Sequence, residues 1–72
     1  MKIVIVGNGK VGFSLADQLV REKYDVVIVD MREDTLRRAA DALDIMSVKG
    51  NGISAATLIE AGVPEADLLV AA

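Results

Sequence analysis

The sequence has 72 residues, of which 53% are hydrophobic and 26% are charged, and its net charge is −3. This composition is typical of a globular domain and excludes intrinsic disorder, which combines low hydrophobicity with high charge. The negative charge and the lack of a basic run argue against a nucleic-acid partner. Because the sequence has no cysteine and no histidine, it excludes disulfides and the usual zinc, haem and iron–sulfur sites.

The first half of the sequence predicts a strand, a helix and a second strand. Residues 3–6 are a β-branched run without polar alternation, which is typical of a strand covered on both faces. From Val11 to Val20 apolar residues recur at helical spacing, which predicts an amphipathic helix. Residues 24–29 repeat the pattern of a buried strand, and Asp30 ends it with a charged side chain.

The second half predicts a helix, a strand, a short helix and a last strand. Over about residues 33–43, one face is apolar and the other carries acid–base pairs four residues apart. Residues 45–48 form a weaker strand that runs into the turn tripeptide at residues 50–52. A short helix is expected from Ser54, a good N-cap, to Gly62, a good residue beyond a helix end. Residues 67–72 form the fourth strand.

This alternation of strands and helices predicts right-handed parallel crossovers. We therefore expect an α/β fold, a Rossmann-like parallel sheet in strand order 3-2-1-4 with helices on both faces. That is slightly more than one mononucleotide-binding half, so residues 1–72 are expected to be the N-terminal part of a Rossmann-type nucleotide-binding domain, an incomplete half-domain. The hydrophobic edge of the last strand predicts either a longer parent chain or a homo-oligomer.

A glycine motif of the form G-x-G-x-x-G stands between the first strand and the first helix. In this context it is the fingerprint of dinucleotide binding. Gly7 permits the tight turn, Gly9 leaves room for the pyrophosphate, and Gly12 lets the helix pack closely. Backbone N–H groups and the helix dipole then bind the phosphates. A glycine-rich turn without a ligand is the alternative. The predicted cofactor-binding residues of the loop are Gly7, Asn8, Gly9, Lys10, Val11 and Gly12.

An acidic residue follows at about the expected distance of 20 residues. Asp30 is predicted to accept hydrogen bonds from the adenosine ribose and to repel a 2′-phosphate, which favours NAD or an unmodified adenine nucleotide over NADP. A solvated strand end or a local cap is the alternative. Arg32 leaves NADP open, since a nearby arginine is the usual device for holding a 2′-phosphate. It could instead stack on adenine or point into water.

Three other polar side chains are weaker candidates. Lys10 and Asn8 could contribute to the phosphate site, although a solvated role is as plausible for each. Asn51 lies after the third strand, on the rim where open α/β sheets bind ligands, and could border the adenine. The alternative for it is a tight turn that leads to the Ser54 cap.

The sequence predicts that the chain is not an enzyme. Without histidine or cysteine, no hydroxyl, lysine or carboxylate side chain forms a recognisable nucleophile–base pair. The aromatic and long apolar side chains of the first helix, and the three methionines, are predicted to be core.

Several stretches together resemble the N-terminal nucleotide-binding domain of TrkA-type potassium-uptake regulators, the RCK or KTN domain. They are MKIVIVGNGKVG at residues 1–12, L-A-x-x-L at 15–19, DVVIVD at 25–30, VKGNG at 48–52 and ADLLVA at 66–71. The glycine turn at 50–52, with the short helix and Ala-Asp pair after it, is the part most particular to this family. The resemblance covers nearly the whole chain.

The resemblance implies a cytoplasmic subunit that binds NAD or NADH, or alternatively ATP or ADP. It also implies assembly into a dimer or ring that gates a membrane potassium-translocating subunit, at the inner face of the cell membrane. On this reading the three motif glycines and Asp30 match nucleotide-binding positions, and Asn51 matches a contact near the adenosine. Arg32 stands where such domains often have a small acidic cap.

Two other interpretations remain open at this point. The chain could be the cofactor-binding N-terminal fragment of an NAD-dependent oxidoreductase, whose catalytic residues would lie beyond residue 72. It could also be a half-domain that dimerises through the fourth strand and binds nothing. We favour the regulator, because the resemblance extends through regions that a generic dehydrogenase has no reason to share.

Overall fold

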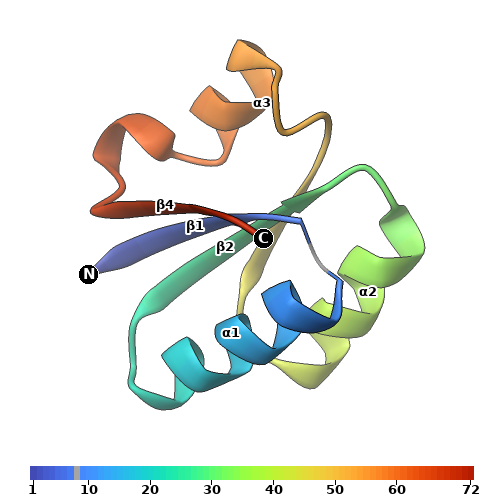
Figure 1. The fold of residues 1–72 in the computed structure, drawn as a ribbon, viewed down its shortest axis with the longest axis vertical. Helices are drawn as coiled ribbons and strands as arrows, with labels where there is room; N and C mark the ends of the chain where they lie inside the picture. The colour runs from blue at the N-terminus through green and yellow to red at the C-terminus, as the bar shows by residue number, and fades with distance from the viewer. Residues whose placement is uncertain (8) are drawn as a thin grey trace.

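The computed structural model describes residues 1–7 and 9–72, which form a sheet with helices on either side (Figure 1). The strands are β1 (Lys2–Val6), β2 (Asp25–Asp30), β3 (Met46–Lys49) and β4 (Leu68–Ala71). The helices are α1 (Lys10–Arg21), α2 (Glu33–Ala42), α3 (Ala55–Glu60) and the short 3-10 helix η1 (Val63–Glu65). All strand pairs are parallel and the order is β3-β2-β1-β4, so the predicted fold class and strand order are confirmed.

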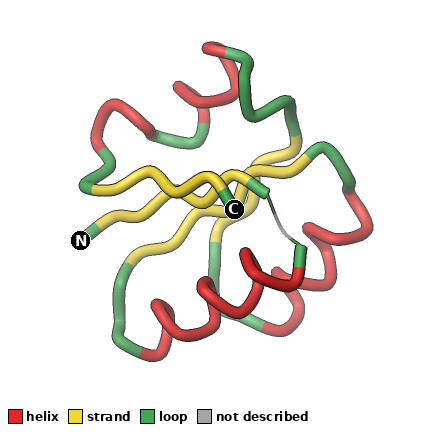
Figure 2. The backbone as a smooth tube through the Cα atoms, in the orientation of Figure 1, coloured by secondary structure: helices red, strands yellow, loops and turns green. Residues whose placement is uncertain are grey.

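Helices cover both faces of the sheet, as predicted. α1 and α2 lie on one face, and α3 and η1 lie on the other (Figure 2). Side chains of a strand alternate between the two faces, so neighbouring residues of β1 and β2 enter different clusters. Ile3, Ile5, Val26 and Ile28 pack with α1 and α2. Val4, Val27 and Val29 pack with Val48 and Ala61. The uninterrupted β-branched runs of the sequence are thus buried on both sides.

The segment from Ser54 to Gly62 begins and ends as its residue types predict. The Ser54 hydroxyl accepts a hydrogen bond from the backbone N–H of Thr57 at 3.4 Å, which caps α3. Gly62 follows the helix with a φ of +87°, the left-handed conformation that glycine adopts without a steric penalty. Pro64 then lies at the start of η1, which the sequence did not predict as a separate element.

The prediction that the methionines are core is wrong. Met1, Met31 and Met46 are exposed by 64%, 64% and 62%. They lie before β1, in the loop after β2 and at the start of the edge strand β3. The sequence does not reveal this exposure, because the burial of an apolar side chain depends on which elements pack against it in the folded sheet.

The edge strand β4 is partly exposed. β4 lies at one edge of the sheet, and its Leu68 and Leu69 are each 48% exposed. This agrees with the hydrophobic edge that the sequence predicts. Within residues 1–7 and 9–72, no helix has the length and apolar character needed to cross a membrane.

Candidate nucleotide-binding site

The polar and glycine-rich segments singled out by the sequence meet at the carboxyl-terminal edge of the sheet, where the parallel strands end. Gly7 directly follows β1, Asp30 is the last residue of β2, and Gly50 directly follows β3. Because the strands are parallel, these carboxyl ends lie together, and open α/β sheets bind ligands at this edge. Backbone hydrogen bonds extend the ladder into the loops, from Gly7 N–H to the Val29 carbonyl at 2.8 Å and from Gly50 N–H to the Asp30 carbonyl at 2.9 Å.

The backbone conformation and the close packing of the turn require glycine at positions 7 and 12. Gly7 has a φ of +101°, and a Cβ there would lie 2.7 Å from the carbonyl oxygen of Ala72. A Cβ on Gly12 would overlap the carbonyl oxygen of Gly7. The turn is therefore tight and the first turn of α1 packs directly on it, which are the two structural roles that the sequence predicts.

Gly9 differs from these two glycines. It is the N-cap residue of α1 with a φ of −82°, which any residue can adopt. Apart from its chain neighbours, no heavy atom of the described residues lies within 4 Å of the position that a Cβ would take. Neither steric crowding nor backbone conformation requires a glycine here, and the space in front of it is open, as a site for an approaching pyrophosphate requires.

The first turn of α1 supplies hydrogen-bond donors beside this open space. The first intrahelical hydrogen bond runs from Phe13 N–H to the Gly9 carbonyl at 2.9 Å, so the N–H groups of residues 10–12 precede it, as in every helix start. Lys10 and Val11 are exposed, Val11 by 72%. Val11 therefore lies in the first turn of α1 but not on its buried face. Asn8, the other predicted loop residue, lies outside the described residues.

Asp30 combines a strand end with a local cap. Its side chain is half-buried, and Oδ1 accepts a hydrogen bond from the Arg32 backbone N–H at 3.0 Å. The local-cap alternative considered for this residue is therefore present. The ribose role that the sequence predicts for this carboxylate stays a prediction.

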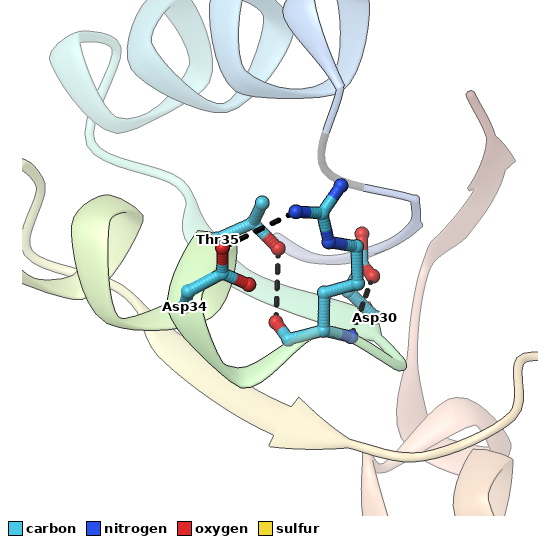
Figure 3. A network of polar contacts seen from close by, with 4 residues as sticks. Asp30, Asp34 and Thr35 are labelled. Atoms are coloured by element: carbon cyan, nitrogen blue, oxygen red, sulfur yellow. Dashed lines mark hydrogen bonds and ion pairs between the residues drawn. The ribbon is translucent and has the colours of Figure 1, made fainter.

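The Arg32 side chain is 69% exposed, and its contact with a nucleotide stays a prediction. Arg32 is the N-cap residue of α2, and its guanidinium forms an ion pair with Asp34, with Nη2 3.2 Å from Oδ2. Its carbonyl oxygen accepts a hydrogen bond from the Thr35 hydroxyl at 2.9 Å. Figure 3 shows this network of Asp30, Asp34 and Thr35 around the loop after β2.

Asp34 belongs to this polar network, although no sequence motif singles it out. Desolvation raises the pKa of Asp34, but the Arg32 guanidinium and the hydrogen bonds from Thr35, Arg32 and its own backbone together hold it below its usual value of 3.8. The available signal was its position in the first turn of α2, where the helix dipole favours a carboxylate. Its pairing with an arginine two residues earlier depends on rotamers and has no sequence signature.

Asn51 lies on the rim of the site, in a locally bonded turn. Its Oδ1 accepts a hydrogen bond from the Ile53 N–H at 3.0 Å, and its carbonyl accepts one from Ser54 N–H at 2.9 Å. A Cβ on Gly52 would overlap the Val6 side chain, so this turn packs against the end of β1. The tight turn that leads to Ser54 is thus observed, beside the glycine loop.

Two of the hollows lined by the described residues bear on the position of the site. One of about 620 Å³ extends from Gly9 and Lys10 along the groove between α1 and α2, past Phe13 and Arg38. A larger one of about 1000 Å³ lies at the opposite edge, lined by residues near the amino ends of the strands such as Lys2, Asp25 and Met46. Size does not decide between them, because the glycine loop and Asp30 are both at the edge where the smaller one begins.

Comparisons with known proteins show the family of the chain. The model of the TrkA-N domain family matches residues 3–72. The Trk system potassium uptake protein TrkA of Halomonas elongata is 45% identical over 71 residues, which are 99% of this chain and 16% of that protein. The protein of the same name from Azorhizobium caulinodans is 44% identical, with the same coverage.

A TrkA homolog from Methanothermobacter thermautotrophicus is 40% identical over 72 residues, 100% of this chain and 33% of that protein. The chain thus spans between 16% and 33% of the length of these relatives. The resemblance stated from the sequence is confirmed.

Proposed function

The chain belongs to the TrkA-N domain family, and from that premise we propose that it is a regulatory domain of a Trk-type potassium uptake system. In this role it binds NAD or NADH, with ATP or ADP as alternative ligands, and gates a membrane potassium-translocating subunit. The observation that carries the proposal is the open start of α1 at Gly9, at the same carboxyl-terminal edge of the sheet as Asp30.

Each part of the ligand meets a suitable group on this account. The N–H groups of residues 10–12 and the positive end of the α1 dipole bind the pyrophosphate, and Lys10 adds a positive charge. Asp30 accepts the ribose hydroxyls and disfavours a 2′-phosphate. Asn51 borders the adenine from the neighbouring loop. ADP and ATP share the adenosine and phosphate groups, so the same contacts suit them.

Regulation requires no catalytic residue. A ligand shifts an assembly between two states when it binds one state more tightly than the other. The relatives described above are named as potassium uptake proteins, which favours this role over the N-terminal part of an oxidoreductase. The proposal includes a homo-oligomeric dimer or ring and a cytoplasmic location at the inner face of the membrane, reached through the membrane subunit.

The test is potassium flux into vesicles that contain the membrane subunit, with the intact protein added outside. We expect a saturable change in flux as NADH or ADP is added, and no change with the Asp30→Ala variant. The matched control is Asp41→Ala, which removes an exposed carboxylate of α2 away from the site and should respond as the wild type does. A flux that ignores nucleotides which the protein demonstrably binds would refute the gating role.

A further inference from the structure

We propose that Asp34 is a specificity-determining residue of the nucleotide site, because it holds the Arg32 guanidinium and so makes the site select adenine nucleotides with a free 2′-hydroxyl over those with a 2′-phosphate. The inference rests on the proposed function, since it assigns a ligand class to the same site. Arg32 is the residue that would otherwise favour the phosphorylated form.

The loop after β2 fixes the backbone of Arg32 from both sides. Its N–H donates to Asp30 Oδ1 at 3.0 Å. Its carbonyl accepts hydrogen bonds from the Thr35 hydroxyl at 2.9 Å and the Leu36 N–H at 3.2 Å. With the backbone held in this way, the guanidinium has a limited reach, and the structure places it on the first turn of α2.

The Asp34 carboxylate is the group that receives this guanidinium, at 3.2 Å between Nη2 and Oδ2 (Figure 3). Both side chains are exposed, by 69% for Arg32 and 63% for Asp34. An exposed pair of this kind is weak and exchanges with solvent, so it biases the position of the guanidinium and does not lock it. A bias is sufficient for specificity, which is a difference between two affinities.

The charge of the loop supports the same selection. Residues 30–34 read Asp-Met-Arg-Glu-Asp, with one cation among three carboxylates. Glu33 faces elsewhere, toward Arg37 at 3.6 Å and Lys49 at 3.7 Å. Once Asp34 neutralises Arg32, that guanidinium no longer offsets the repulsion between the Asp30 carboxylate and a 2′-phosphate. A ribose hydroxyl carries no charge and avoids this repulsion.

The experiment is calorimetric titration of the intact protein with NADH and, separately, NADPH. The variants are Asp34→Asn, the matched control Glu33→Gln, and the double variant Arg32→Gln with Asp34→Asn. Glu33→Gln removes the same charge from the adjacent residue without touching the Arg32 pair. Circular dichroism checks that each variant is folded.

We expect the wild type to bind NADH more tightly than NADPH, and Asp34→Asn to reduce this preference by about two- to fivefold, the size of one exposed charge pair. The double variant should recover the wild-type preference, and Glu33→Gln should leave it nearly unchanged. An equal effect of Asp34→Asn and Glu33→Gln would overturn the inference, since the net charge of the loop alone would then explain the preference for NADH over NADPH. If NADH binds and the preference does not respond to Asp34→Asn, only this inference fails. If the wild type binds neither nucleotide, it fails together with the proposed function.

Discussion

Replacing Gly9 by alanine separates what the ligand requires from what the fold requires. The residue has a φ of −82°, and no heavy atom of the described residues beyond its chain neighbours lies within 4 Å of an added Cβ. The loss of a glycine N-cap costs on the order of 1 kcal/mol, and the reduced freedom of the unfolded chain returns roughly 0.4–1 kcal/mol. The free energy of unfolding should therefore change by less than about 1 kcal/mol.

The same methyl group should weaken NADH binding strongly. It would occupy the space through which the pyrophosphate approaches the first turn of α1, and forcing a methyl into a packed contact costs roughly 1–3 kcal/mol. That corresponds to a loss of affinity of about five- to 150-fold. Urea unfolding followed by circular dichroism measures the stability, and calorimetric titration with NADH measures the affinity.

Gly12→Ala is the matched control for stability. Its Cβ would overlap the Gly7 carbonyl oxygen, so we expect a loss of stability of at least about 1 kcal/mol even after the gain in helix propensity. The reasoning is refuted if Gly9→Ala binds NADH as the wild type does, or if it loses as much stability as Gly12→Ala.

Two further predictions concern the helix starts. Ser54→Ala removes the cap of α3, whose hydrogen bond is long at 3.4 Å. The free energy of unfolding should therefore fall by about 0.5 kcal/mol, the low end for such caps. Urea unfolding measures this loss, and the control is Ser14→Ala, which changes an exposed serine inside α1. The pKa of Asp34 is lowered on folding, so its contribution is present above the ordinary pKa and is lost as the pH falls through the lowered value. Unfolding midpoints measured below pH 3.8 should therefore fall more steeply for the wild type than for Asp34→Asn, and parallel curves would contradict the pairing.

Much of the fold can be predicted from the sequence, because its strongest signals are ones that tertiary packing reinforces. The runs at residues 3–6 and 26–29 are apolar and β-branched throughout, which is typical of a strand covered on both faces. Alternation with helices then gives parallel crossovers and the order β3-β2-β1-β4. The cap at Ser54 and the stop at Gly62 also follow from residue type, because few other residues make those contacts or adopt that φ.

The parts that the sequence does not give are those decided by neighbours in space. Met46 has an apolar side chain yet is exposed, since β3 is an edge strand. Arg32 has several partners within reach, and the choice of Asp34 depends on rotamers and the loop backbone. For the site, the motif located the glycine loop and Asp30 correctly at one edge of the sheet, while their role in binding a nucleotide stays a prediction.

The most direct test of nucleotide binding follows the backbone amide NMR signals of Gly7, Gly9 and Gly12 in isotope-labelled protein during titration with NADH and, in parallel, ADP. We predict that these signals shift saturably, and that the shifts are lost in Asp30→Ala and retained in Asp41→Ala. A folded protein whose glycine signals stay unmoved at millimolar nucleotide would contradict the account.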